Sequence, residues 1–259
     1  MYFQDSYSGL PSKFETFRKN IELTDSQRTK IQSSHIHLRE KILQPLNYVS
    51  HTFLTGSYKK KTLIKPANDI DAFVVLSGYD QYDITPNSIL NKLKNDLQSS
   101  YPNSKIKQNK PCVVIEFNHI TFELTPAIEI ESFWGHDSEF YIPNMNSSNE
   151  WQKIENPRIL EKSLTSANKS LNNKLNPLIK MMKKCKQYNN LDNVMSFEME
   201  KMAIDQLYSI NGYRDGVEKL LRIYDWTDNR YSQYDIESMT DDDFAYYCRN
   251  TLFGNDFPS

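Results

Sequence analysis

Two aspartates, Asp69 and Asp71, open an apolar run that reaches Leu76 and is followed by Ser77-Gly78. A short apolar run between turn residues is typical of a β-strand. Because side chains alternate along a strand, residues two apart point to the same face, so the two carboxylates lie side by side. Mg²⁺ binds oxygen ligands and prefers one or two protein carboxylates together with phosphates and water. The pattern therefore predicts a strand with a divalent-cation site, and its alternative is a solvated acidic strand edge.

A glycine and a serine, Gly56-Ser57, follow the β-type run 51–54 upstream of these acids. Glycine permits close backbone approach, and the N–H and hydroxyl groups that follow it can donate to a phosphate. The loop that leads on to Asp69 contains the basic run 59–61, which predicts either contacts with phosphates or RNA or a solvated loop. We therefore expect strand, turn, loop and strand, with a phosphate at the turn.

The composition of the 259-residue chain fits a folded globular protein better than a protein that coats nucleic acid. It is 38% hydrophobic, which is enough for one large domain or two small lobes, and its net charge is -2. No window approaches the roughly 18 apolar residues of a membrane span, and the first residues lack a signal-peptide pattern, so we expect a cytoplasmic protein without membrane association. The three cysteines are far apart and form no CxxC pair, which predicts reduced, packed thiols.

Hydrophobic periodicity divides the chain into a strand-rich part and a helical part. The polar stretch 137–157 shows no sustained period and predicts an exposed connection, and the acidic triplet 241–243 predicts solvated surface. We expect domains at 1–150 and 151–259. The predicted elements are a helix at 26–46 with Asp25 or Ser26 as its N-cap, a strand at 70–76, a helix at 88–99, a hairpin of 112–117 and 120–124 that Pro126 closes, and helical runs at 157–188, 196–210 and 216–224.

The run Leu54-Thr55-Gly56-Ser57, followed by Asp69-Ile70-Asp71-Ala72-Phe73, resembles the signature of DNA polymerase β-like nucleotidyltransferases. In that family the Gly-Ser turn holds a triphosphate, and the two aspartates hold two Mg²⁺ or Mn²⁺ ions with a third carboxylate from a neighbouring strand. The resemblance implies that Glu123 is this third acid, although the family usually has Asp there. Glu116, in the same hairpin, is the alternative.

Other pieces resemble the CD-NTases, bacterial relatives of oligoadenylate synthetase and cyclic GMP-AMP synthase that make cyclic oligonucleotides. The resemblance implies an α+β fold: a polymerase β-like core with a mixed β-sheet, and a C-terminal helical lobe that completes the nucleotide pocket. It also implies that Lys183 and Ser196 contact the donor triphosphate, whereas the alternative for Lys183 and its neighbouring lysines is a solvated helix side. The matching pieces are 122–127, Trp151 with Asn156-Pro157, Asn168, 177–183 and 196–200.

The function implied is a metal-dependent nucleotidyltransferase that makes a cyclic di- or oligonucleotide second messenger from NTPs, ATP and/or GTP among them, in anti-phage signalling of the CBASS type. Its implied partners are the nucleoside triphosphates, an RNA or protein activator and a downstream effector of the product. One alternative is a toxin-like transferase that modifies tRNA or protein, though such small relatives usually lack the elements of 151–200. The others are a non-catalytic nucleotide sensor on the same fold and an interaction protein with an accidental motif. Tyr79, Tyr82 and Phe133-Trp134 are candidates for base stacking or for the core.

Overall fold

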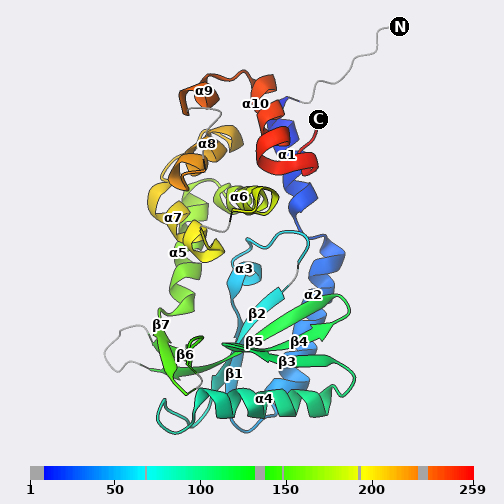
Figure 1. Ribbon diagram of the computed structural model, residues 1–259, viewed down its shortest axis with the longest axis vertical. Coiled ribbons are helices and arrows are strands. Elements are labelled where there is room, and N and C mark those ends of the chain that lie inside the picture. Colours follow the sequence, from blue (N-terminus) through cyan, green and yellow to red (C-terminus); the bar gives the residue numbers. More distant parts are fainter. Residues whose placement is uncertain (1–8, 68, 132–137, 148, 192–193, 227–232) are drawn as a thin grey trace. The chain divides into compact units, whose positions relative to one another are not determined.

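The computed structural model of the protein describes residues 9–67, 69–131, 138–147, 149–191, 194–226 and 233–259 (Figure 1). Its contacts divide the chain into two compact units. The helical unit comprises Met1–Leu23, Thr62–Lys65 and Lys162–Ser259, and the sheet unit comprises Thr24–Lys61 and Pro66–Glu161. A functional division near residue 150 stays a prediction.

Seven strands of the described part of the chain form one mixed sheet in the sheet unit. They are β1 (Val49–Leu54), β2 (Asp69–Leu76), β3 (Lys105–Asn109), β4 (Cys112–Phe117), β5 (Ile120–Ile130), β6 (Glu139–Pro143) and β7 (Trp151–Ile154). Their order is β1-β2-β5-β4-β3, with β6 paired to β5 and β7 to β6. Only the pairing of β2 with β5 is parallel among these, so the expected mixed sheet of an α+β fold is confirmed.

The helices of the sheet unit are α2 (Asp25–His37), the single turn α3 (Gly56–Lys59) and α4 (Pro86–Ser100). The N-cap of α2 is Thr24, not Asp25 or Ser26, because the Thr24 hydroxyl accepts from the Gln27 N–H at 3.2 Å and the Gln27 side chain accepts from the Thr24 N–H at 2.9 Å. A π-helical segment, Leu38–Leu43, continues α2. The helix predicted at 88–99 is confirmed as α4, whose four apolar side chains at helical spacing are buried.

Two expectations for this unit are wrong. The stretch 137–157 contains β6 and β7, which its weak periodicity hid because both strands are short and lack a regular alternation of apolar and polar residues. Phe140 of β6 is nevertheless fully buried, with its ring centroid 6.1 Å from that of Phe53 and 6.3 Å from that of Phe73. Pro126 does not close the hairpin either, since β5 continues to Ile130. Leu124 is the last residue of β5 paired with β4, and a proline is tolerated where no ladder partner follows on that side.

The helical unit confirms the helical lobe expected after residue 157. Its helices are α1 (Leu10–Ile21), α5 (Pro157–Ser170), which begins in the sheet unit, α6 (Leu175–Asn189), α7 (Ser196–Gln206), α8 (Tyr213–Ile223), α9 (Gln233–Ser238) and α10 (Asp241–Tyr247). The run predicted as continuous from 157 to 188 is two helices, because Asn172 and Asn173 adopt left-handed conformations, with φ of 53° and 61°, that asparagine tolerates. The first helix joins the core through Phe14 and Phe17, whose ring centroids lie 5.2 and 5.4 Å from that of Phe257.

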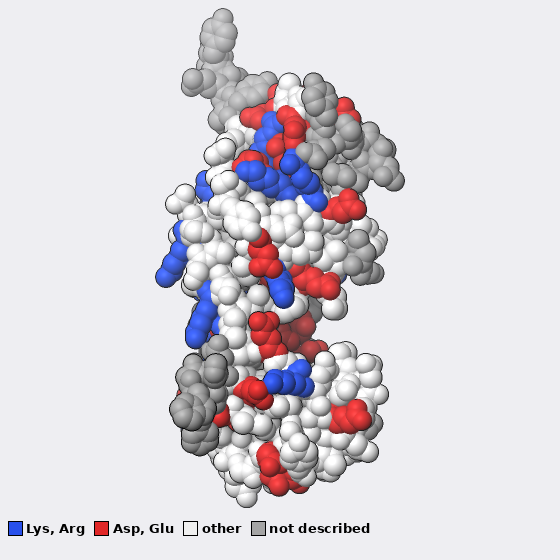
Figure 2. Space-filling view, turned by 90° about the vertical axis from the view of Figure 1, so that its left-hand side faces the viewer, with Lys and Arg blue, Asp and Glu red and all other residues white. Residues whose placement is uncertain are grey.

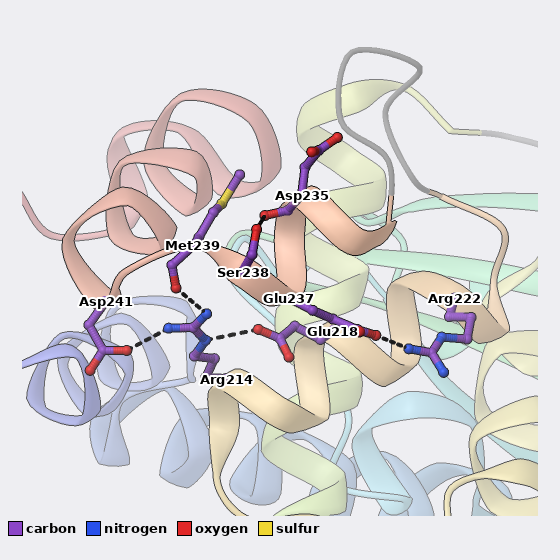
Figure 3. A network of polar contacts seen from close by, with 8 residues as sticks. All are labelled: Arg214, Glu218, Arg222, Asp235, Glu237, Ser238, Met239 and Asp241. Atoms are coloured by element: carbon purple, nitrogen blue, oxygen red, sulfur yellow. Dashed lines mark hydrogen bonds and ion pairs between the residues drawn. The ribbon is translucent and has the colours of Figure 1, made fainter.

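Charges on the helical unit are mostly matched. The acidic triplet 241–243 is exposed, as expected, and forms the first turn of α10, where acidic side chains stabilise the helix. Figure 3 shows Arg214 donating to Asp241 at 2.6 Å, to Glu218 at 2.8 Å and to the Met239 carbonyl at 2.7 Å. On the face drawn in Figure 2, basic and acidic side chains are interspersed, which agrees with the net charge near zero.

The three cysteines are buried and free, as the sequence predicts. Within the described ranges, no helix has both the length and the apolar character required for crossing a membrane.

Candidate active site

Parallel pairing of β2 with β5 places three acids together. Asp71 lies opposite Glu123 and Asp69 lies opposite Thr121, and residues that face each other across two paired strands project to the same side of the sheet. One carboxylate oxygen from each of Asp69, Asp71 and Glu123 lies within 4.8 Å of the others. The D-x-D pattern alone predicts the first two members of this carboxylate cluster. The third requires the strand register.

The carboxylate cluster holds more negative charge than its surroundings balance. Burial, followed by the charges of Asp69 and Glu123, raises the pKa of Asp71 to about 6, and Lys60 opposes this only in part. Burial and the Asp69 charge also raise the pKa of Glu123. The Cys112 thiol donates to the Asn109 carbonyl at 3.0 Å, and burial together with the charges of Glu123 and Asp71 raises the pKa of that thiol to about 12. A divalent cation would relieve this repulsion, so the donor set fits the two Mg²⁺ or Mn²⁺ ions that the sequence implies.

The Gly-Ser turn lies directly against the carboxylate cluster. The Thr55 N–H donates to the Asp71 carbonyl at 2.9 Å, and Gly56 then adopts a φ of 62°. A Cβ atom at Gly56 would lie 1.7 Å from Oδ2 of Asp71. Glycine is therefore required twice, for the left-handed backbone and for the close approach to the aspartate. Where we expected a plain loop, Gly56 and Ser57 begin α3.

Two lysines of the basic run 59–61 face acids. The Lys59 Nζ lies 3.3 Å from Oε1 of Glu161, and Lys60 is close enough to Asp71 to lower the pKa of that carboxyl. Lys59 is exposed, as a solvated loop predicts, although it also pairs with Glu161, and Lys60 is only partly exposed. Contact of these lysines with phosphates or RNA stays a prediction.

Glu116, the alternative third acid, is held by other groups. It accepts from Lys107 at 3.0 Å and pairs with Lys105 at 3.1 Å, and the hydrogen bonds from these two lysines lower the pKa of its carboxyl. It does not belong to the acidic group that the described residues form around Asp71. The geometry favours Glu123 over Glu116.

Lys183 and Ser196 belong to the helical unit, so their contact with a triphosphate stays a prediction. The Lys183 side chain is buried, and its Nζ donates to Oε1 of Glu200 at 2.8 Å and to Oγ1 of Thr62 at 3.0 Å. Lys180 is also buried and donates to Glu22 at 2.8 Å. The alternative of a solvated helix side is therefore wrong for both lysines. Ser196 is exposed and is the first residue of α7.

Three residues of the sequence resemblance have structural contacts. The Trp151 indole N–H donates to the Ile84 carbonyl at 2.9 Å. The Asn156 side chain accepts from the Arg158 N–H at 3.0 Å at the start of α5, and the Asn168 side chain accepts from the Asn176 N–H at 3.0 Å between α5 and α6. Tyr82 is 86% exposed and so is not a core residue, whereas Phe133-Trp134 lies outside the described residues.

Sequence reasoning missed Thr62 and Glu200 as partners of Lys183. Glu200 lies within the run 196–200 that carries the resemblance, and this could have marked it as a candidate functional residue. Its role is visible only once α6 and α7 are packed together.

The family model of the Second Messenger Oligonucleotide or Dinucleotide Synthetase domain matches residues 9–168. This range contains the Gly-Ser turn and all three acids of the carboxylate cluster. It comprises more than half of the chain.

Individual proteins are similar over different extents. A probable cyclic AMP-AMP-GMP nucleotide synthase of Salmonella paratyphi B is 32% identical over 108 residues, which cover 39% of this chain and only 28% of that protein. A probable cyclic nucleotide synthase of Bacillus cereus is 25% identical over 253 residues, covering 82% of this chain and 75% of that protein. The structure of Escherichia coli MS115-1 CdnC with ATP has a TM-score of 0.73 at 14% identity and covers 96% of this chain and 99% of that chain. The last likeness shows a shared fold.

Proposed function

Because this chain belongs to the Second Messenger Oligonucleotide or Dinucleotide Synthetase family, a family of nucleotidyltransferases, we propose that it joins nucleoside triphosphates into a cyclic di- or oligonucleotide. The observation that carries the proposal is the carboxylate cluster of Asp69, Asp71 and Glu123 with Gly56 packed against it. Similarity to two probable cyclic nucleotide synthases supports the same reaction.

Each residue at the cluster has a role in this reaction. Asp69, Asp71 and Glu123 would hold the divalent cations, and Glu123 would also accept the proton of the attacking ribose hydroxyl. When bound, such a pair of cations activates the nucleophile and neutralises the leaving pyrophosphate. The Gly56-Ser57 turn donates hydrogen bonds to the triphosphate, and Lys183 and Ser196 complete its contacts. The cations are Mg²⁺ or Mn²⁺.

The test is incubation of the purified protein with four labelled NTPs, ATP and GTP among them, and with Mg²⁺ or Mn²⁺. We expect small labelled products that resist phosphatase, because a cyclic product has no terminal phosphate. Asp69→Asn and Asp71→Asn should abolish them. Glu139→Gln is the control, since Glu139 is an acid of the same sheet that pairs with Lys153 at the surface. Products that persist in both aspartate variants would rule out the cluster as the catalytic centre.

The same assay separates the alternatives. Label on added tRNA or protein would indicate a modifying transferase, and nucleotide binding without any product, with RNA added or not, would indicate a sensor. A cytoplasmic role in CBASS-type anti-phage signalling, with an RNA or protein activator and an effector that responds to the product, stays a prediction.

A further inference from the structure

Lys183 belongs to a set of mutual hydrogen bonds inside the helical unit. Its Nζ donates to Glu200 and to Thr62, and the Thr62 hydroxyl donates to the same Glu200 oxygen at 2.6 Å. Glu200 is 1% exposed, Lys183 is 7% exposed and Thr62 is fully buried. We call these three residues the lysine triangle. Each of its side chains contacts the other two, so the position of the ammonium is fixed from two directions.

Thr62 reaches the triangle from a separate part of the sequence. It opens the short segment Thr62–Lys65, which belongs to the helical unit although the residues before and after it belong to the sheet unit. Ile64 is buried in the helical core, and the Lys65 N–H donates to the Ile21 carbonyl at 2.8 Å. The Gly56-Ser57 turn ends only five residues before Thr62. The chain therefore runs directly from the proposed phosphate-binding turn to the lysine triangle.

A second buried lysine on the same helix provides a comparison. Lys180 pairs with Glu22, which also accepts from Arg18 at 3.3 Å and has a side chain 18% exposed. Glu22 is thus one acid shared by two cations at the edge of the unit. Glu200 is more deeply buried and is joined to Lys183 by a hydroxyl as well. Charges buried this deeply are costly to desolvate, and hydrophobic residues of similar volume often stabilise a protein as much, so stability alone does not account for the triangle.

We propose that Glu200 and Thr62 are positioning residues that fix the Lys183 ammonium for the triphosphate of the bound nucleotide. This inference rests on the proposed function. A free lysine side chain loses rotamer entropy when it is ordered, so an ammonium ordered before binding holds a phosphate more tightly. Glu200 supplies the negative charge that pairs with the ammonium, and the hydrogen bond to Thr62 orients the ammonium.

The test measures nucleotide affinity separately from turnover. Equilibrium binding of labelled ATP and GTP, in the presence of Mg²⁺ and at low temperature, is compared for wild type, Glu200→Gln, Thr62→Val and Thr62→Ser. We expect Kd and KM to rise about tenfold in Glu200→Gln and about threefold in Thr62→Val, with kcat changed less than KM, since preorganisation acts on binding. Thr62→Ser keeps the hydroxyl and should restore wild-type affinity.

Glu22→Gln is the matched control, because it removes the other acid paired with a buried lysine of α6. It should lower the thermal midpoint without changing Kd. An unchanged Kd in both Glu200→Gln and Thr62→Val would overturn the inference, as would an equal rise in Kd in Glu22→Gln. A tighter Kd in Glu200→Gln would also overturn it, since Glu200 would then compete with the phosphate.

Failure of the proposed function has a different signature. A wild-type protein that binds ATP but forms no product contradicts the synthase activity, and the variants still decide the role of the triangle by Kd alone. A wild-type protein that binds no nucleotide contradicts both.

Discussion

Each unit of the protein brings a group of charged side chains together, and the two groups differ in charge balance. In the sheet unit, Asp69, Asp71 and Glu123 repel one another, and Lys60 opposes the raised pKa of Asp71 only in part. In the helical unit, Lys183 and Glu200 neutralise each other within 2.8 Å, and Thr62 completes the set. The carboxylate cluster therefore gathers like charges, whereas the lysine triangle pairs opposite charges. Removal of a charge should have opposite consequences for stability in the two units.

The largest expected effect concerns the third acid. Glu123→Gln should lower activity by about 1,000-fold, because it removes both the negative charge that binds a cation and the group that accepts the proton. Glu116→Gln should stay within about threefold of wild type, since Glu116 pairs with Lys105 and Lys107 at the surface. Initial rates of product formation at saturating NTP and cation would measure both. A larger loss of activity in Glu116→Gln than in Glu123→Gln would make Glu116 the third acid and would contradict the contrast between the two units.

The next effect compares one glycine from each unit. Gly56→Ala should lower activity by about 100-fold, because the new methyl group would displace the Asp71 carboxylate and misplacement of about 1 Å can cost that much. In Gly216→Ala the methyl group would lie 2.4 Å from Cδ1 of Leu178, a flexible side chain in the core of the helical unit. There we expect a loss of about 1–3 kcal/mol in stability with little change in rate per folded molecule.

Rates corrected for the folded fraction, measured by circular dichroism, would test this pair. Wild-type activity in Gly56→Ala would show that the aspartate does not need its present position.

Stability provides the most direct contrast between the two charge groups. Glu200→Gln should lower the free energy of unfolding by about 3 kcal/mol, because it leaves the Lys183 charge buried without its carboxylate. Asp71→Asn should raise that free energy by about 1–2 kcal/mol in the absence of divalent cations, because it removes repulsion. Urea titration at neutral pH with EDTA measures both. The same sign of change in the two variants would contradict the contrast.

The smallest effect is a dependence of stability on pH. The pKa of Asp71 is about 6 when folded against an ordinary value of 3.8, so the folded state binds the proton more tightly. Its contribution is therefore complete below about pH 4 and is lost as the pH rises through about 6, a loss of about 1–2 kcal/mol after allowance for solvent. Mg²⁺ at neutral pH should restore this stability. The difference between wild type and Asp71→Asn, followed by thermal unfolding from pH 4 to 8, should show the slope.

Local pattern alone predicts much of this protein. The strand β2, the helix α4 and the helical runs after 157 follow from apolar spacing, because each buries one continuous face. The strands β6 and β7 were not predictable in this way, since both are short and their apolar residues do not alternate regularly with polar ones. Pro126 misleads for a related reason: a proline is tolerated there because β4 begins only at Cys112, so no residue of β4 pairs with Pro126.

The site residues also divide into those that local pattern predicts and those that depend on contacts between distant segments. Asp69 and Asp71 are two residues apart, so strand geometry pairs them, and Gly56 is identified by its own conformational freedom. Glu123 joins them only through the register of β5 against β2, and sequence resemblance was needed to choose it over Glu116. Thr62 and Glu200 are 138 positions apart, and no short-range rule connects them.

The segment Thr62–Lys65 also limits how this protein can be divided or recombined. The core of the helical unit includes Phe14 and Phe17 from the first helix and Ile64 from this segment, together with residues after 162. A fragment that starts at 162 would leave apolar surface uncovered where those side chains belong. Exchange of the C-terminal helices between relatives should therefore succeed only when α1 and the stretch 62–65 are transplanted with them, so that three separate pieces of gene are inherited as one.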